Sequence, residues 1–333
     1  MEFLSQTDVI ILSLGTLFLG MAILVKGGDW TIDGAVEIAR HYGMPPLLVG
    51  FTIVAFGTSL PELIASVNAN IKGTPGLAVG NVIGSNIANL MLIGGVSAMI
   101  APLLGNLKAI RNDLFMMVIA TCVWVYVLMT MPIGVAIGGT ALGLLVGYIV
   151  LQYQLAKEGM ANAKALMDLE KTAEEAAPKN HKRAILMVVG GLIALALGAE
   201  LLIRGSVTTA RILNIPDAVI GLTIIAIGTS LPELTTCVIA AMKKQSDVII
   251  GNLVGSNVFN LMMILGSMGI IKKYDMREGA NLIMLNQDSI IMIAVTILFV
   301  LTLLFFKRIP RAVGGVFAFG YLAYIILLTY QSM

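Results

Sequence analysis

The sequence predicts an all-α polytopic membrane protein, built as ten transmembrane helices in two inverted five-helix repeats. Hydrophobic residues make up 58% of the 333 residues and charged residues 12%, and the mean hydropathy is +0.94. Soluble domains carry about 25% charged residues, so this composition indicates a chain that is mostly embedded in lipid. The net charge of +2 gives no indication of nucleic-acid binding. A duplicated motif predicts the repeat.

A run of about 20 apolar residues is long enough to cross the hydrocarbon core of a bilayer as a helix. The first and sixth apolar runs of this chain are long, and each becomes polar in its second half. We expect ten spans, at residues 9–38, 45–71, 75–101, 113–131, 133–155, 184–212, 216–242, 246–271, 287–306 and 310–331.

One connection between spans is long and charged, namely residues 156–183. It divides the chain into a first repeat at 1–155 and a second repeat at 184–333. We expect it to be a solvated linker that is helical as far as Pro178. Its acidic residues lack the spacing and the glycine of a calcium-binding loop, so a regulatory metal site is the weaker interpretation.

The two halves of the chain share an internal duplication. A shift of 171 residues, without gaps, superposes residues 50–90 on residues 221–261. Each unit contains five spans, and since five is odd, the second unit crosses the membrane in the opposite sense. Inverted repeats of this kind place the sites of many secondary transporters near the membrane midplane. The matched segments are Gly57–Leu63 with Gly228–Leu234, Gly80-Asn81 with Gly251-Asn252, Gly84-Ser85-Asn86 with Gly255-Ser256-Asn257, and Asn89-Leu90 with Asn260-Leu261.

The basic residues predict the orientation, because Lys and Arg favour cytoplasmic connections. With the N-terminus outside, fourteen of the 21 Lys and Arg residues fall in cytoplasmic connections and five in outer ones. We therefore expect both termini on the extracytoplasmic side. The compact chain, without a further domain, favours the inner membrane of a prokaryote.

The duplicated motif reads AFGTSLPE at residues 55–62 and AIGTSLPE at residues 226–233. Each copy places a glutamate, Glu62 or Glu233, in an apolar run, where a carboxylate costs about 2.5–3.5 kcal/mol to insert. Pro61 has no N–H to donate to the preceding turn and loosens it. Because the chain carries such a buried carboxylate twice, at matched positions, the sequence predicts a functional site.

Oxygen ligands surround each glutamate. Thr58 and Glu62 are four residues apart, which predicts that they share a helix face, and the proline leaves a backbone carbonyl without its donor. Hydroxyls, free carbonyls and carboxylates are the ligands that calcium, magnesium and sodium prefer. The repeated basic residues fall in connections, so Glu62 and Glu233 require a cation or protons to balance them.

A second repeated motif, GSNIAN in the first half and GSNVFN in the second, adds polar side chains. Ser85 and Asn89 lie four residues apart on one helix face, and Ser256 and Asn260 repeat the arrangement. Hydrogen bonding between helices explains these side chains as well as ion binding does. Glycines spaced four apart also predict close helix packing, at Gly80 and Gly84 and at Gly251 and Gly255.

GTSLPE followed by GSNxxN, present twice and inverted, resembles the alpha-repeats of the sodium/calcium exchangers in the cation/calcium exchanger superfamily. The resemblance covers essentially the whole chain, with the alpha-1 motif at 50–90 and the alpha-2 motif at 221–261. It implies ten helices, of which the broken second, third, seventh and eighth form an ion-binding core. It also implies that the long first and sixth helices slide across this core during alternating access.

The same resemblance implies the ligands. Calcium would lie between the two glutamates and the two threonine carbonyls, with sodium sites on either side. Carried onto matching positions, the ligands are the Ala55 carbonyl, Thr58, Ser59, Glu62, Ser85 and Asn89, together with the Ala226 carbonyl, Thr229, Ser230, Glu233, Ser256 and Asn260.

Asn260 bears on the coupling stoichiometry. Some family members have Asp at this position, and the potassium-dependent branch resembles those. With Asn at both 89 and 260, the core has two formal negative charges, which one calcium ion neutralises. Three sodium ions would leave one positive charge, so a three-for-one exchange would be electrogenic. We expect exchange that is independent of potassium.

The resemblance implies a secondary antiporter that expels calcium from the cytoplasm in exchange for sodium, with no enzyme activity and no cofactor. The expected partners are calcium ions, sodium ions and the lipid bilayer, and the functional unit is expected to be a monomer. The alternative is a calcium/proton antiporter that uses the same carboxylates, although proton-coupled relatives usually show a different signature. A channel-like or non-transporting membrane scaffold explains the hydrophobicity but not the duplicated glutamates.

Overall fold

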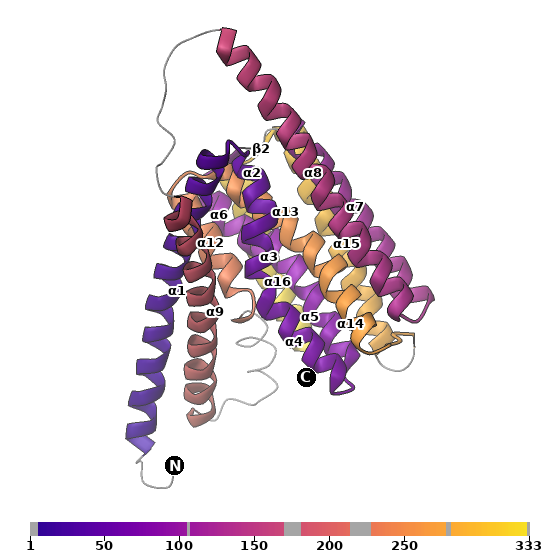
Figure 1. Cartoon of the computed structure of the whole chain (residues 1–333). Coiled ribbons are helices and arrows are strands. Elements are labelled where there is room, and N and C mark those ends of the chain that lie inside the picture. The colour runs from indigo at the N-terminus through magenta and orange to yellow at the C-terminus, as the bar shows by residue number, and fades with distance from the viewer. Residues whose placement is uncertain (1–5, 105–106, 170–180, 214–227, 278–280, 332–333) are drawn as a thin grey trace.

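The computed structural model describes residues 6–104, 107–169, 181–213, 228–277 and 281–331. In these ranges the regular elements are helices, apart from two strands of 2 residues each. Figure 1 shows the helices gathered into one bundle, with α1 and α9 side by side on one flank. Three short stretches, labelled η, are π-helical.

The elements follow one another with short connections. The first half contains α1 (Gln6–Tyr42), α2 (Pro46–Val49), η1 (Gly50–Val54), α3 (Ala55–Thr58), α4 (Leu60–Ile71), α5 (Pro75–Ala88), η2 (Asn89–Ile93), α6 (Gly94–Ile100), β1 (Leu103–Leu104), α7 (Leu107–Thr130) and α8 (Val135–Leu169). The second half contains α9 (His181–Ile212), α12 (Leu231–Met242), α13 (Ser246–Phe259), η4 (Asn260–Ile264), α14 (Leu265–Ile271), α15 (Asn281–Phe306), β2 (Arg308–Ile309) and α16 (Arg311–Gln331).

Within the described residues, 8 helices are long and apolar enough to cross a membrane. A further span is the pair Pro46–Thr58 and Leu60–Ile71, whose two helices are bent by 42°. These coincide with nine of the expected spans. The remaining one, expected at 216–242, is described only from residue 228, and α12 occupies its second half.

α8 does not end with the fifth expected span at residue 155. It continues to Leu169, so the first part of the expected linker is a helical extension, which Figure 1 shows projecting beyond the rest of the bundle. The extension is rich in Ala, Lys and Met, which are good helix formers. The expected end of the helix at Pro178 lies outside the described residues.

α1 and α9 pack antiparallel along a seam of glycines. A Cβ on Gly20 would lie 2.7 Å from the carbonyl oxygen of Gly198, and a Cβ on Gly27 would lie 2.9 Å from that of Gly191. Only glycine permits backbones to approach this closely. The glycines are spaced seven apart, which keeps them on one helix face. The seam consists of Gly20, Gly27 and Gly34 on α1 and Gly191, Gly198 and Gly205 on α9.

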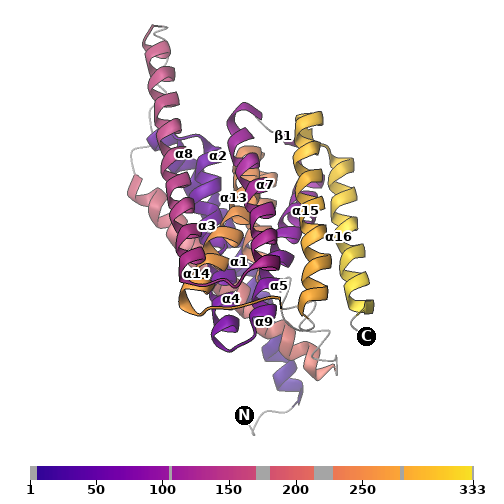
Figure 2. The same cartoon turned by 90° about the vertical axis from the view of Figure 1, so that its right-hand side faces the viewer.

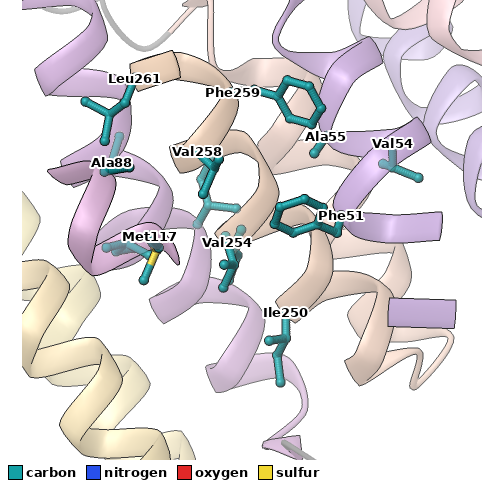
Figure 3. Close-up of a cluster of buried hydrophobic side chains, with 14 of the residues drawn as sticks. Phe51, Val54, Ala55, Ala88, Met117, Ile250, Val254, Val258, Phe259 and Leu261 are labelled. Atoms are coloured by element: carbon teal, nitrogen blue, oxygen red, sulfur yellow. The ribbon is translucent and has the colours of Figure 1, made fainter. Parts of the chain in front are cut away.

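α13 is the central helix of the core. All its residues from Val248 to Phe259 are buried, including the polar residues Asn252, Ser256 and Asn257. Figure 3 shows Val254 and Phe259 of α13 gathered with Phe51 of η1 and with Met117 of α7. The rings of Phe51 and Phe259 have centroids 6.3 Å apart.

The glycine pair of α13 brings this helix against the α2–η1 segment. A Cβ on Gly251 would lie 2.8 Å from the backbone nitrogen of Phe51, and one on Gly255 would lie 2.8 Å from the Cβ of Ala55. This confirms the packing predicted for these two glycines. Gly80 and Gly84 have no described residue within 4 Å of such a Cβ. Because the segment equivalent to α2–η1 falls at residues 217–225, outside the described ranges, packing there stays a prediction.

Short backbone pairings join connections at both ends of the bundle. β1 pairs antiparallel with β2, with Leu103 opposite Ile309, and Ile133 forms an antiparallel bridge with Tyr274. Figure 2 shows β1 toward the end from which α8 projects. α1 begins and α16 ends toward the opposite end in both views (Figures 1 and 2).

Candidate cation-binding site

Each copy of the duplicated motif lies where one helix ends and another begins. α3 ends at Thr58 and α4 begins at Leu60, so Ser59 is the junction and Pro61 stands in the first turn of α4. A proline there removes no helical hydrogen bond, because the first N–H groups of a helix have no partner within it. Ser230 precedes α12 with φ −89° and ψ 8°, close to the −82° and 1° of Ser59. The predicted interruption is confirmed.

The break changes one detail of the prediction. The sequence predicts that Thr58 and Glu62 share a face of one helix, whereas they belong to α3 and α4. Both side chains are nevertheless buried, at 1% exposure each. Glu62 lies in the first turn of α4, and Glu233 in the first turn of α12, where the helix dipole favours a negative charge.

The two motifs are joined by reciprocal hydrogen bonds. Ser59 Oγ donates to Glu233 Oε1 at 3.3 Å, and Ser230 Oγ donates to Glu62 Oε1 at 3.2 Å. Ser230 Oγ also lies 3.4 Å from the hydroxyl of Ser85. Because each serine contacts the glutamate of the other motif, the two copies form a single site. Both glutamates are 1% exposed.

Several buried oxygens of this site have no hydrogen-bond partner among the described residues. A buried polar atom without a partner costs free energy, most of all when it carries charge. A hard cation relieves this cost, because it binds several oxygens at once. The unpaired oxygens are Oε2 of Glu62 and Glu233, Oδ1 of Asn89 and Asn260, Oγ1 of Thr229 and Oγ of Ser256.

Two other carboxylates within the spans have polar partners. Asp113 accepts a hydrogen bond from the hydroxyl of Tyr148 at 2.6 Å, and Asp288 accepts one from Tyr324 at 2.9 Å. Both pairs link adjacent peripheral helices, α7 with α8 and α15 with α16. The glutamates of the motif are different, because each leaves one oxygen unpaired by the described residues.

The structure joins five of the sequence-predicted site residues through hydrogen bonds, namely Ser59, Glu62, Ser85, Ser230 and Glu233. Thr229 is half-buried, and the other predicted site residues that the structure describes are buried, namely Ala55, Thr58, Ser59, Glu62, Ser85, Asn89, Ser230, Glu233, Ser256 and Asn260. The Ala55 carbonyl accepts bonds from the Ser59 N–H at 3.1 Å and from Thr58 Oγ1 at 3.4 Å. Ala226 lies outside the described residues.

The two asparagines occupy matching backbone distortions. Asn89 is the first residue of η2 and Asn260 the first residue of η4. A π-helical turn inserts one extra residue into a helix and often occurs at functional sites. The sequence did not indicate these turns, because no residue type marks them.

Three further asparagines support the site and were not among the predicted ligands. Asn260 Nδ2 donates to Asn86 Oδ1 at 3.1 Å, and Asn86 Nδ2 donates to the Asn257 carbonyl at 3.4 Å. Thr58 Oγ1 donates to Asn252 Oδ1 at 3.5 Å. The duplication carries the signal for them, since residues 86 and 257 are both Asn and so are 81 and 252.

The motif glycines adjoin α9. A Cβ on Gly57 would overlap the side chain of Leu192, and a Cβ on Gly228 would lie 2.5 Å from Cγ1 of Ile203. Leu192 and Ile203 are eleven residues apart, which places them on one face of α9. α9 therefore lies over both copies of the motif.

Comparisons with known proteins agree with this architecture. The family model described as sodium/calcium exchanger protein matches residues 12–154 and 183–330. The inner membrane protein YrbG of Escherichia coli strain K12 is 30% identical over 325 residues, covering 97% of this chain and 98% of YrbG. The sodium/calcium exchanger MaX1 of Methanosarcina acetivorans is 29% identical over 345 residues, covering 94% of this chain and 97% of MaX1.

A solved structure of the sodium-calcium exchanger NCX_Mj has the same fold. The two structures superpose with a TM-score of 0.80 at 27% sequence identity, covering 95% of this chain and 98% of NCX_Mj.

Proposed function

Because this chain belongs to the sodium/calcium exchanger protein family, we propose that it exchanges sodium for calcium across a membrane by alternating access. Membership makes the chain a transporter of the cation/calcium exchange type rather than an enzyme, and an integral membrane protein. The proposed direction is calcium extrusion from the cytoplasm. The observation that supports the ion site is the pair of buried glutamates, cross-linked by serines and each with one unpaired oxygen.

The proposed calcium ligands come from both motifs. Glu62 and Glu233 supply the charge, and Thr58 and Thr229 supply neutral oxygens beside them. The proposed sodium ligands are the remaining oxygens, from Ala55, Ser59, Ser85, Asn89, Ala226, Ser230, Ser256 and Asn260. Since calcium and sodium both need the two glutamates, the core holds one kind of ion at a time, and this mutual exclusion produces exchange instead of cotransport.

Charge balance sets the proposed electrical behaviour. Two carboxylates neutralise one calcium ion, whereas three sodium ions leave one positive charge in the core. Moving one charge through the membrane field is worth about 2.3 kcal/mol per 100 mV, so a negative interior favours calcium extrusion. With Asn at position 260 in place of a third carboxylate, we propose that exchange does not require potassium.

We propose ten helices in two inverted repeats, at 1–155 and 184–333, joined by the 156–183 linker. The backbone pairings at the two ends of the bundle support this arrangement. Leu103 pairs with Ile309 between β1 and β2, and Tyr274, which is the counterpart of Leu103 at the shift of 171, forms the bridge to Ile133. α1 begins and α16 ends toward the same end, as an even number of spans requires (Figure 2). The distribution of basic residues supports that end lying outside the cytoplasm, and the name of YrbG favours the inner membrane.

Calcium uptake into liposomes tests the proposal. Purified protein is reconstituted, the liposomes are loaded with sodium, and they are diluted into sodium-free buffer with radiolabelled calcium at fixed pH. A parallel sample contains choline and an imposed pH gradient. We expect uptake that requires internal sodium and ignores the pH gradient. Uptake driven by protons without sodium would instead establish calcium/proton exchange through the same carboxylates.

A further inference from the structure

One part of the helix pair α1–α9 packs into the main core, through residues such as Ile32 and Val188. The pair also has its own small apolar cluster, centred on Leu24, Leu195 and Ala199, in addition to the glycine seam. Ions have no direct route to Glu62 and Glu233, which are 1% exposed, so an element that covers them must move. α9 covers both motifs, and α1 is bound to it along the seam, so we take these two helices to move together.

One basic side chain ties α1 to the core. Lys243 follows α12 directly, in the turn that leads into the buried helix α13. Its Nζ lies 2.5 Å from Asp29 Oδ1 and 2.6 Å from Asp33 Oδ1, both on α1. The two aspartates are one helical turn apart, so a single ammonium group bridges them.

The environment strengthens this contact. The Lys243 side chain is 29% exposed, against 37% for Asp29 and 50% for Asp33. Partial burial works to lower the pKa of Lys243, but the hydrogen bonds that its ammonium donates to Asp29 and Asp33 outweigh this effect, and the pKa is raised. The ammonium is therefore charged at physiological pH. An ion pair that is partly desolvated is screened less by salt than an exposed one.

The equivalent turn in the first half lacks this anchor. Lys72 is the counterpart of Lys243 at the shift of 171, and the backbone of the turn is also matched, since Gly73 and Lys244 both have positive φ, at +84° and 58°. Lys72 is exposed and forms no ion pair with any described residue. At the same shift, Asp29 becomes Glu200, which pairs with Arg204 on its own helix.

This second end keeps only one of the two acidic residues that bind Lys243. Asp33 is replaced at the shift of 171 by Arg204, which would repel Lys72 instead of binding it. The first turn is fixed elsewhere, because Asn70 Nδ2 donates to the carbonyls of Met268 and Lys272, at 3.1 and 2.8 Å. Among the described residues, ion pairs thus anchor the α1–α9 pair at the α12–α13 turn, and Lys72 forms none at the counterpart of that turn.

We propose that Lys243 is a positioning residue for exchange, which holds the α1–α9 pair in one of its two orientations through Asp29 and Asp33. The proposal rests on the proposed function, since it assumes alternating access. An inverted repeat alone would make the two orientations nearly equivalent. The one-sided contact removes that equivalence, so it biases which face of the membrane the ion site opens to.

Apparent calcium affinity at the two faces tests this. A site that opens to one face for a fraction of the time has its apparent affinity there reduced by that fraction. The ratio of half-saturating calcium concentrations at the two faces therefore reports the orientation equilibrium. In oriented vesicles, we expect Lys243→Gln to change this ratio by about three- to tenfold, with the two affinities moving in opposite directions.

Three variants serve as controls. Lys243→Arg retains the charge and is expected to keep the wild-type ratio. Lys72→Gln removes the counterpart lysine and is also expected to leave the ratio unchanged. Asp33→Asn weakens the anchor from the α1 side and is expected to move the ratio in the same direction as Lys243→Gln. Asp33→Asn therefore provides the test if Lys243→Gln does not fold.

The outcomes are distinguishable. If both Lys243→Gln and Asp33→Asn retain exchange and leave the ratio of calcium affinities unchanged, the role assigned to Lys243 is wrong, while the proposed function stands. A parallel loss of affinity at both faces would also overturn the role assigned to Lys243, because that result indicates general damage to the site. Absence of sodium-dependent calcium exchange in the wild-type protein would overturn the proposed function itself.

Discussion

At the scale of residues, Glu62 and Glu233 each use one carboxylate oxygen to accept a hydrogen bond from a serine of the other motif. The second oxygen has no partner among the described residues. Asp113, in contrast, is buried beside Tyr148, which donates to it. A buried carboxylate that lacks donors needs a positive charge, and this need supports the proposal that both glutamates bind the exchanged cations.

Replacing either glutamate with glutamine removes a charge but keeps the shape. We expect Glu62→Gln and Glu233→Gln to lower exchange by a factor of about 100 or more, because loss of one partner of a buried charge interaction costs about 3–5 kcal/mol. The readout is sodium-dependent calcium uptake in liposomes. Asp113→Asn, which also neutralises a buried carboxylate, is the matched control and is expected to retain exchange. Calcium uptake that persists in the glutamine variants would contradict the assignment of Glu62 and Glu233 to the ion site.

Asn260→Asp adds a third negative charge to the core. With two charges, the calcium-loaded core is neutral, so calcium–calcium exchange is expected to be insensitive to membrane potential. With three charges the calcium-loaded core has a charge of −1, and we expect the same exchange to become voltage-dependent. Tracer exchange in liposomes at potentials set by an ionophore measures this. Asn86, which accepts from Asn260 at 3.1 Å, can turn its amide to donate to the new carboxylate. Exchange that stays insensitive to voltage would refute the charge count.

At the scale of elements, the broken helices and the glycine seam have opposite roles. The break at Ser59 fixes the direction of the Glu62 side chain, and the crossed serine bonds hold it against the second motif. The α1–α9 seam instead joins two long helices by close backbone contact at its glycines. We expect a seam of this kind to keep the pair together while leaving it able to move as a unit.

Gly27→Ala tests the seam. The new Cβ would lie 2.8 Å from the backbone nitrogen of Leu195, so the helices must separate, and overpacking of this kind costs about 1–3 kcal/mol. We expect a lower melting temperature in detergent and slower exchange. The matched control is Gly15→Ala on the same helix, where nothing lies within 4 Å of the Cβ. Alanine is the better helix former, by about 1 kcal/mol, so the control is expected to melt at the same temperature or higher. Equal melting of the two variants would contradict a close-packed seam.

At the scale of the whole molecule, the arrangement of charges and ends determines orientation. Both the start of α1 and the end of α16 lie away from the α8 extension (Figures 1 and 2). The α8 extension and the segment after it contain much of the positive charge, which favours the cytoplasm. We therefore propose that the ends near the termini face the opposite side.

Labelling from the two sides of the membrane tests this orientation. In a background with Cys122→Ala and Cys237→Ala, a single cysteine is placed at Lys164 or at Ser332. We expect an impermeant thiol reagent added to intact cells to reach Ser332→Cys and not Lys164→Cys, with both labelled after the cells are opened. The reverse pattern would place the linker outside and invert the proposed direction of transport.

Sequence alone was sufficient for the features that depend on local chemistry. The spans follow from the cost of leaving polar backbone groups in lipid, which any apolar run of sufficient length avoids. The site follows from the cost of a carboxylate in that setting, because Glu62 and Glu233 recur at matched positions with Pro and Gly beside them. The resemblance then identified the family, and the family match confirmed it.

Only the tertiary structure decided which residues meet. The Ser59–Glu233 and Ser230–Glu62 bonds, the Asn86–Asn260 contact and the Lys243 anchor join residues more than 160 positions apart. No local pattern specifies such contacts, because they depend on which helices become neighbours and at what rotation. The same holds for the π-helical turns at Asn89 and Asn260, and for the difference between Lys72 and Lys243, which are identical residues in equivalent turns with different surroundings.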